Sequence, residues 1–335
     1  MIYRSDIVKL ILLAFGVLLL MFVNISWGDA IIPQKHVFSI LFGKISENSS
    51  WSYIIEERWL RTLNAVISGG ALAISGLIIQ SFFRNPLAGP GVLGISSGAS
   101  VGVAFAILAG DSLSGWFGFS QYFLGFSGAF IVLMILMILN KWVKGVTLLV
   151  IGLMISFFAS SFVSLLLNVS DAIQTKKYVE WGFGSFSTVS SDSFYAYMLL
   201  LMLLILVCLL YFPKLLNAWV YGENQVSAAG YSIKGSRLLI ILVIGLIVAL
   251  VTIECGPISF IGIAIPQVAR MLFKTSHHFI LLLASFIGGA FIAVLSDIIL
   301  RNAGFSLPLN AITALFGAPI IIWVILRGSK TLQMQ

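Results

Sequence analysis

The chain has 335 residues, of which 60% are hydrophobic and only 9% are charged, and its mean hydropathy is +1.09. A soluble domain carries about 25% charged residues because its surface must be hydrated, so most of this surface faces lipid rather than water. The composition therefore excludes a cytosolic enzyme, a nucleic-acid-binding protein and a secreted disulfide-rich scaffold as descriptions of the whole chain.

Ten apolar runs follow one another along the chain, most of them close to the roughly 20 residues that cross a ~30 Å hydrocarbon core. They cover residues 7–27, 60–82, 91–109, 117–139, 145–168, 191–211, 236–254, 258–273, 279–298 and 309–327. The eighth run begins after Gly256-Pro257 and is short, so it is not expected to cross the full thickness alone. The sequence predicts an all-α polytopic membrane protein in which residues 1–335 form a single transmembrane domain.

The charges predict the orientation of these spans. The 19 basic residues, which give a formal net charge of +7, are scattered between apolar runs rather than gathered on one face, so no nucleic-acid partner is expected. Most of them fall in segments that share a side with the N-terminus, where only two acidic residues, Asp6 and Glu223, are found. By the positive-inside rule, the N- and C-termini are predicted to be cytoplasmic, with membrane lipid around the spans.

Small residues recur every four positions in two of the predicted helices. They are Gly94, Gly98 and Gly102 in the third run, and Ser285, Gly289 and Ala293 in the ninth. Because lipid supplies no hydrophobic drive for helix association, close backbone contact must hold such helices together. The stripes therefore predict helix packing rather than a binding site, and the two cysteines, Cys208 and Cys255, are likewise expected to be structural.

No catalytic set is found in the sequence. The string GISSG at residues 94–98 matches a serine hydrolase pattern, but Ser96 lacks the strand-to-helix turn, acid and histidine that this chemistry needs. Adjacent His277 and His278 cannot converge on a metal from one helix face and are predicted to lie in a solvated inner loop, while His36 lies outside. The chain is therefore predicted to be non-catalytic.

A transporter needs an energy source, and the sequence limits the options. Ion-coupled carriers bury ionisable groups at mid-membrane, whereas here they lie near span ends, and no phosphate-binding loop of the G-x-x-x-x-G-K-[ST] type occurs. If this chain moves a solute uphill, another polypeptide must bind the ATP. A stand-alone secondary carrier or channel is the alternative, and an intramembrane lipid-modifying enzyme is a third.

Two blocks of sequence resemble one transporter family. They are RTLNAVISGGALAISGLIIQSFFRNPLAGPGVLGISSGAS at 61–100, and GPISFIGIAIPQVAR at 256–270 with SDIILR at 296–301 and LPLNAITALFGAPIIIWVIL at 307–326. They resemble the permeases of FecCD-type, binding-protein-dependent ABC importers, which take up ferric siderophores, haem and cobalamin, and the signature extends over residues 58–327. The chain departs from the family pattern at a missing proline between Arg58 and Arg61, at Gln267 in place of histidine, and at Ser306 and Asn310 in place of glutamate and glycine.

The resemblance implies the type II ABC importer permease fold and a homodimer whose subunits share one pathway. The implied partners are two cytoplasmic ATP-binding subunits, which bind ATP and Mg, and an extracytoplasmic substrate-binding protein, so no cofactor is expected in this chain. The implied location is the bacterial cytoplasmic (inner) membrane. The implied cargo is a bulky iron chelate, either a ferric siderophore, or else haem or cobalamin.

The resemblance also assigns roles to three groups of residues. Binding-protein docking falls to Arg58, Arg61 and Arg301, since a guanidinium grips a carboxylate with two parallel bonds; the alternative is that they are interface anchors. The inner loop at 213–237 resembles a pair of short coupling helices that seat the ATPase, with Gly222, Glu223, Gln225, Ser227, Ala228 and Gly230. The pathway and outer gate are assigned to Ser156, Ser160, Ser164, Trp181, Gly184 and Ser185, although Trp181 also suits an aromatic belt at the membrane surface.

Overall fold

The computed structural model describes residues 4–28, 30, 32–41, 49–108, 121–143, 146–187, 191–302 and 307–332, and within these ranges the secondary structure is entirely helical. Seven helices in this part of the chain are long and apolar enough to cross a membrane: α1 (Arg4–Ser26), α3 (Ser49–Phe83), α6 (Gln121–Leu139), α7 (Val146–Val169), α9 (Ser191–Val220), α11 (Ile233–Cys255) and α13 (His278–Asn302). Further apolar helices are α4 (Ile95–Leu108), α12 (Ile261–Phe273) and α14 (Leu309–Leu332). Short helices connect them: α2 (Gln34–Leu41), the 3-10 helix η1 (Pro90–Leu93), α8 (Ala172–Gly182) and α10 (Glu223–Ala228).

Each of the ten predicted runs coincides with one of these apolar helices, and the eighth run is the 13-residue helix α12. The second predicted span, which corresponds to α3, is longer than expected, because α3 begins at Ser49 instead of near residue 60. The docking candidate Arg58, predicted to lie just ahead of this span, therefore lies within α3, as Arg61 does.

The loop predicted at 213–237 also differs, because α9 continues through Pro213 to Val220. A proline inside a helix costs a backbone hydrogen bond, which favours a helix end at this point in the sequence. The structure offsets this cost by burying Phe212, Leu215 and Trp219, each at most 4% exposed, on the continued helix. Only α10 remains as a short helix in this segment, where two had been expected.

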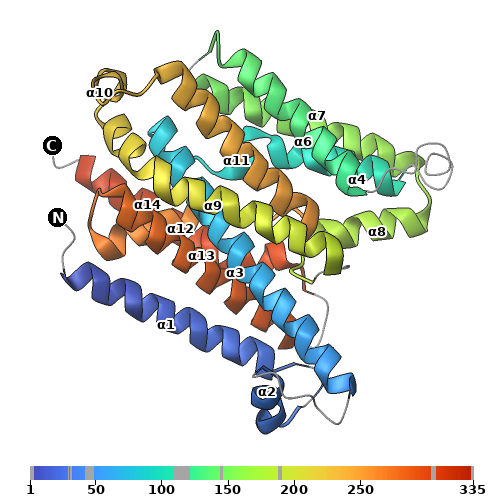
Figure 1. The fold of residues 1–335 in the computed structure, drawn as a ribbon. Helices are drawn as coiled ribbons and strands as arrows, with labels where there is room; N and C mark the ends of the chain where they lie inside the picture. Colours follow the sequence, from blue (N-terminus) through green and yellow to red (C-terminus); the bar gives the residue numbers. More distant parts are fainter. Residues whose placement is uncertain are drawn as a thin grey trace.

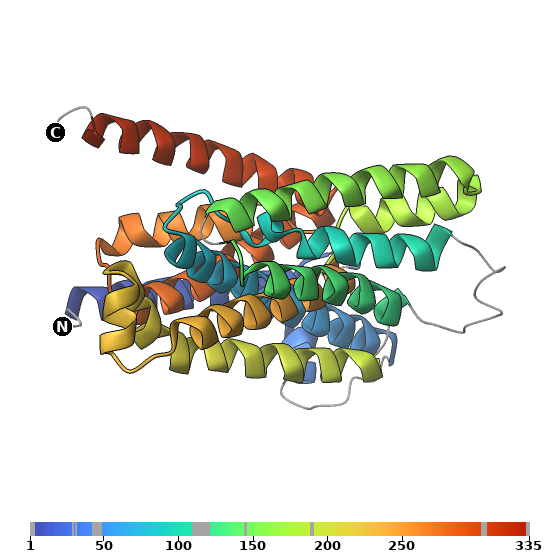
Figure 2. The same ribbon diagram turned by 90° about the horizontal axis from the view of Figure 1, so that it is seen from above.

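The long helices run side by side, and the connections divide between the two ends of the bundle (Figure 1). The start of α1, the end of α14 and α10 lie at one end, which we call the inner end, while α2 and α8 lie at the other, the outer end (Figures 1 and 2). This places both chain ends together, as the even number of predicted spans requires. The membrane side that each end faces remains the prediction made from the charges.

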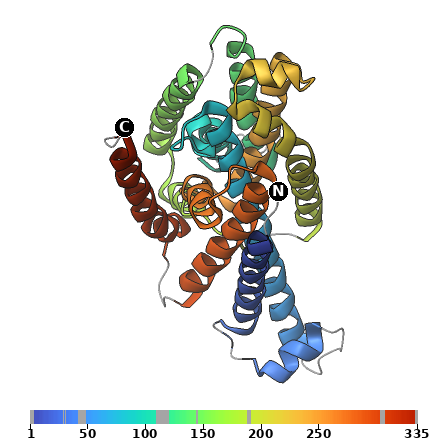
Figure 3. The same cartoon turned by 90° about the vertical axis from the view of Figure 1, so that its left-hand side faces the viewer.

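Helix α3 lies at the centre of the bundle and packs against α13, α12, α9 and α11 (Figure 3). The predicted stripes of small residues are confirmed as packing surfaces. A Cβ atom on Gly102 would lie 1.9 Å from the carbonyl oxygen of Leu124, so α4 and α6 touch through their backbones. In the same way Gly289 of α13 faces Gly69 of α3, where a Cβ would lie 2.3 Å from the Gly69 carbonyl oxygen.

The cysteine prediction is confirmed, since Cys208 and Cys255 are both free and buried. The prediction of a solvated loop at the paired histidines is correct for His277, which is exposed, and wrong for His278, which is 1% exposed and begins α13. Its Nε2 lies 2.9 Å from the hydroxyl of Ser81 and its Nδ1 lies 2.8 Å from the side-chain oxygen of Asn217. These contacts join α13 to α3 and α9 and account for the burial of a polar ring.

Candidate functional site

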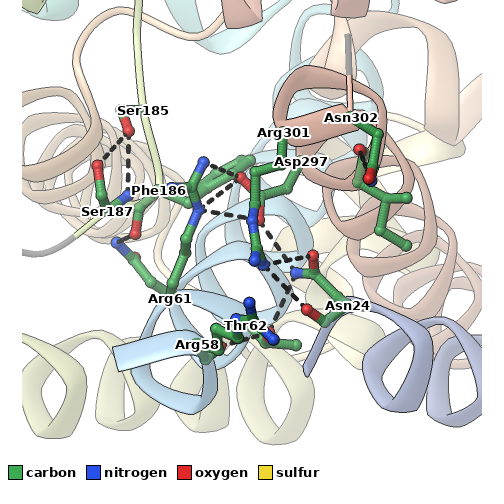
Figure 4. Close-up of polar contacts among 12 residues, drawn as sticks. Asn24, Arg58, Arg61, Thr62, Ser185, Phe186, Ser187, Asp297, Arg301 and Asn302 are labelled. Carbon is green, nitrogen blue, oxygen red and sulfur yellow. Dashed lines mark hydrogen bonds and ion pairs between the residues drawn. The ribbon is translucent and has the colours of Figure 1, made fainter. Parts of the chain in front are cut away.

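The three arginines predicted to dock a binding protein lie together at the outer end, where α1, α3 and α13 meet (Figure 4). Arg61 of α3 grips Asp297 of α13: its Nε lies 2.9 and 3.0 Å from the two carboxylate oxygens, and its Nη2 lies 2.7 Å from Oδ1. The side chain of Asp297 is 1% exposed and that of Arg61 is 15% exposed. This is a bidentate, largely buried ion pair that joins two helices through residues 236 positions apart in the chain.

Asn24 of α1 completes the cluster. Its side-chain nitrogen donates hydrogen bonds of 3.0 Å to Asp297 and to the hydroxyl of Thr62. Its backbone oxygen accepts a 2.9 Å hydrogen bond from Arg301, and its side-chain oxygen accepts a longer one of 3.3 Å. Asn24 is 1% exposed, so these bonds satisfy an amide that would otherwise be costly to bury.

Arg58 is 5% exposed and secures the segment that follows α1. It donates hydrogen bonds to the backbone oxygens of Ile25 and Ala30, at 3.2 and 2.8 Å. The guanidiniums of Arg58 and Arg301 both approach Gly28, where a Cβ atom would lie 2.8 and 1.9 Å from their respective Nη2 atoms. Only glycine fits at this point without moving an arginine.

Three members of this cluster, the arginines, were predicted from the sequence, whereas Asn24 and Asp297 had no predicted role. Each was visible as a polar residue within an apolar run, in VNIS at 23–26 and in VLSDII at 294–299. Their pairing was not visible, because 273 residues separate them. The use of the three arginines in docking stays a prediction.

The segment around α10 lies at the inner end and is mostly exposed (Figure 1). Its buried residue is Val226, at 0% exposure, which fixes α10 to the bundle, while Gln225, Ser227 and Ala228 face outward. Glu223 forms an ion pair with Arg237 at the start of α11. The flanking Gly222 and Gly230 have φ angles of 111° and 84°, in the region that favours glycine.

A cavity of about 350 Å³ adjoins this segment. It is lined by Phe82, Phe83, Arg84, Asn140, Leu148, Trp219, Gly222, Glu223 and Arg237. The structure thus brings the predicted coupling residues Gly222 and Glu223 to the edge of a recess beside the ends of α3 and α9. Seating of an ATPase here stays a prediction.

The residues predicted to line a pathway lie in two places. On α7, the hydroxyls of Ser156 and Ser164 donate hydrogen bonds of 3.1 and 3.0 Å to backbone oxygens four residues earlier. These hydroxyl groups therefore already have partners within the helix. Ser160 and Ser164 are exposed, and so are neighbouring Phe157 and Phe158, at 60 and 74%. The outer face of α7 therefore has few polar groups to offer a solute.

The second group, Trp181, Gly184 and Ser185, lies at the outer end, against the last residues of α11. The indole nitrogen of Trp181 lies 3.5 Å from the Ile253 oxygen, and the Ser185 nitrogen lies 2.8 Å from the Cys255 oxygen. Within the described residues, none of the three α7 serines forms a hydrogen bond with this group. Whether either group lines a pathway stays a prediction.

Asn310, one of the departures from the family pattern, links this segment to α14. Its side chain donates to the Gly182 oxygen at 3.1 Å and accepts from the Ser259 nitrogen at 3.1 Å. The other departures have separate outcomes. Gln267 donates to Gln80 and to the Pro86 oxygen, at 2.8 and 2.9 Å, whereas Ser306 lies outside the described residues.

An apolar bundle with exposed hydrophobic side chains around it and polar clusters at its two ends is a multi-pass membrane protein. Its fold is that of ABC importer permeases. It matches a solved structure that is assigned to the metal-chelate type of ABC transporters and is in an inward-facing conformation. The TM-score is 0.81 at 26% identity, and the match covers 95% of this chain and 99% of the other. PsaBC from Streptococcus pneumoniae matches in fold alone, with a TM-score of 0.55 at 17% identity over 87% of this chain and 95% of the other.

Residues 16–327 match the model of the FecCD transport family, and the chain belongs to this family. The hemin transport system permease protein HmuU of Yersinia pestis is 30% identical over 321 residues, covering 94% of this chain and 96% of its own length. The vitamin B12 import system permease protein BtuC of Salmonella paratyphi A is 31% identical over 282 residues, covering 83% and 85%. Members of the family are transport permease subunits, so the expected family and fold are confirmed.

Proposed function

We propose that this chain is the membrane permease subunit of an ATP-driven importer that carries a bulky metal chelate into the cytoplasm. The observation that supports this most strongly is the similarity to HmuU and BtuC over most of their lengths, since their names assign them to haem and vitamin B12 import. The cargo is a ferric siderophore, haem or cobalamin. The membrane is the bacterial cytoplasmic membrane, with the inner end of the bundle in the cytoplasm.

In this proposal the chain works as a homodimer. Helices α7 and α14 lie on the same side of the bundle (Figure 3), and both carry exposed large apolar residues, among them Phe158 at 74% and Leu315 at 74%. A second copy covers this face and the two subunits enclose the pathway between them. Because the hydroxyls of Ser156 and Ser164 are already bonded within α7, the wall binds cargo weakly, which suits a system whose selectivity lies in its binding protein.

Partners act at the two ends. Two ATPases bind at the inner end, where α10 is exposed and the adjoining cavity offers a recess. A substrate-binding protein docks at the outer end through acidic residues that approach Arg61 and Arg301. The ion pair of Arg61 with Asp297 holds that guanidinium in a fixed orientation in the absence of a partner.

Co-purification and ligand-stimulated ATP hydrolysis test the proposal. The full chain, purified in mild detergent from its own cells, is expected to bring an ATPase with it, and the complex in proteoliposomes is expected to hydrolyse ATP faster with a loaded binding protein. Ferric siderophore, haem and cobalamin are compared in the same preparation. A chain that purifies alone and conducts in response to a proton or sodium gradient would instead be a carrier or channel.

A further inference from the structure

A second cavity of about 350 Å³ opens at the inner end, at the level where three helices stop. It is lined by Gln80, Ser81, Arg84, Pro86, Val220, Gln267 and Arg270. Val220 is the last residue of α9, Arg84 directly follows the last residue of α3, and Arg270 is in the last turn of α12. Because the apolar spans end here, the cavity lies at the depth of the lipid head groups.

The lining contains two cations and no acid. In the described residues Arg84 and Arg270 take part in no ion pair. The two acidic residues that the sequence places at this end are occupied elsewhere: Asp6 lies 3.9 Å from Lys9, and Glu223 pairs with Arg237. The lining of this cavity therefore holds two positive charges and no negative one, although Arg84 also lines the first cavity, where Glu223 pairs with Arg237.

Both guanidiniums keep most of their hydrogen-bonding capacity. Arg84 donates to the Trp219 backbone oxygen at 2.9 Å, and Arg270 donates to the Ser81 hydroxyl at 3.2 Å. An arginine has five N–H donors, so a single internal bond leaves the remainder of each fork for a ligand. Such forks match the oxygens of a phosphate group.

The orientation of Arg270 is maintained by a chain of polar contacts behind it. Ser81 accepts from Arg270 and lies 2.9 Å from the Nε2 of His278, whose Nδ1 lies 2.8 Å from the side-chain oxygen of Asn217. Ser81, at 6% exposure, and His278, at 1%, are both buried. This explains why the protein buries a histidine that performs no other evident task.

We propose that this cavity binds the phosphate head group of an anionic phospholipid from the inner leaflet. The charge and the donors call for an oxyanion, and the apolar surface beside them suits acyl chains: Val220 is 46% exposed and Leu87, next to the lining residue Pro86, is 42% exposed. Basic pockets between transmembrane helices on the cytoplasmic side bind anionic head groups in this manner. Inorganic phosphate has the same chemistry and is the competing source.

Lipid retention by the purified full chain tests this inference. The chain is stripped of lipid, supplied with phosphatidylglycerol or phosphatidylcholine, and analysed by native mass spectrometry and thermal unfolding. Wild type is expected to retain phosphatidylglycerol in preference and to be stabilised by it. Each of R84Q and R270Q is expected to weaken this binding about tenfold, the contribution of a charge-assisted hydrogen bond.

Matched variants separate the site from general charge effects. K214Q removes an exposed cation from α9 that does not line the cavity, and should bind as wild type does. R270K keeps the charge but loses the fork, and should bind with intermediate affinity; it also serves if R270Q does not fold. Stabilisation of wild type by inorganic phosphate alone, with no preference for phosphatidylglycerol, would assign the site to free phosphate and overturn the lipid proposal.

Two further results would also overturn it. One is equal retention of the two lipids by wild type. The other is loss of ATPase binding in R84Q with lipid retention unchanged, because it would mean that a carboxylate of the partner protein is the occupant.

Discussion

Replacing Asp297 by asparagine tests the role of the outer cluster. Asparagine keeps the size of the side chain and one carbonyl oxygen, but it removes the charge that Arg61 contacts through Nε and Nη2. Breaking a buried ion pair by removing one partner costs roughly 3–5 kcal/mol. Because the Arg61 side chain keeps 15% exposure, water relieves part of its burial, and we expect D297N to lower the free energy of unfolding by about 3 kcal/mol.

The double variant makes the test specific. R61Q leaves Asp297 buried without its cation and is expected to cost a similar amount, whereas R61Q/D297N leaves no unpaired charge. The double variant should therefore lose about 3–4 kcal/mol rather than the sum of about 6, a coupling of roughly 2–3 kcal/mol. Equilibrium unfolding in mixed detergent micelles measures all four free energies.

The chain provides a control in the pair Lys176 and Glu180 on α8, which lies 3.7 Å apart with side chains 77 and 59% exposed. Such surface pairs contribute about 0–1 kcal/mol, so E180Q should change stability little. Effects of R61Q and D297N that add within about 0.5 kcal/mol would refute the reasoning, because the two groups would then not interact.

Three further outcomes are expected. Gly76→Leu should prevent folding, because a Cβ there would lie 1.6 Å from a backbone oxygen of α12. Gly91→Ala is the control and should fold normally, because nothing lies within 4 Å of a Cβ there. The yield of monodisperse protein measures both. Gly230→Trp should still fold, because nothing lies within 4 Å of a Cβ there, but at a cost of roughly 1–2 kcal/mol, because its φ of 84° strains any residue other than glycine. The variant should keep ATP hydrolysis while abolishing uptake, and normal uptake would place the ATPase seat elsewhere. Arg301→Glu should abolish capture of the loaded binding protein in a pull-down. Lys35→Glu, at an exposed position of the outer end, is the control and should leave capture unchanged. Unchanged capture by the Arg301 variant would exclude Arg301 from the docking surface.

Hydropathy predicted the membrane helices because the bilayer imposes length and polarity on every span. It failed where tertiary contacts decide. The apolar run ends at residue 211 and predicted an inner loop from residue 213, but burial of Phe212 and Leu215 carries α9 seven residues past Pro213. The stripes around Gly102 and Gly289 were predictable, since in lipid few other arrangements bring backbones together.

The polar clusters were less accessible to sequence reasoning. The arginines at both ends were visible as basic residues at the span boundaries, and family resemblance gave three of them a role. The residues that contact these arginines could not be predicted. At the outer end, Asn24 and Asp297 contact each other from positions 273 residues apart, and at the inner end Ser81 and His278 do so from positions 197 residues apart. A histidine next to another polar residue at the start of a span predicts solvent exposure, and only the packing of α3 and α9 around it reverses that expectation.

Uptake into sealed proteoliposomes tests the central claim that this chain is a conduit without its own energy source. Radiolabelled chelate is presented outside with the binding protein, ATP is enclosed, and vesicles holding the chain alone are compared with vesicles that also hold the partner ATPase. We predict accumulation against a gradient only when both partners and ATP are present. Accumulation against a gradient by the chain alone would contradict the account.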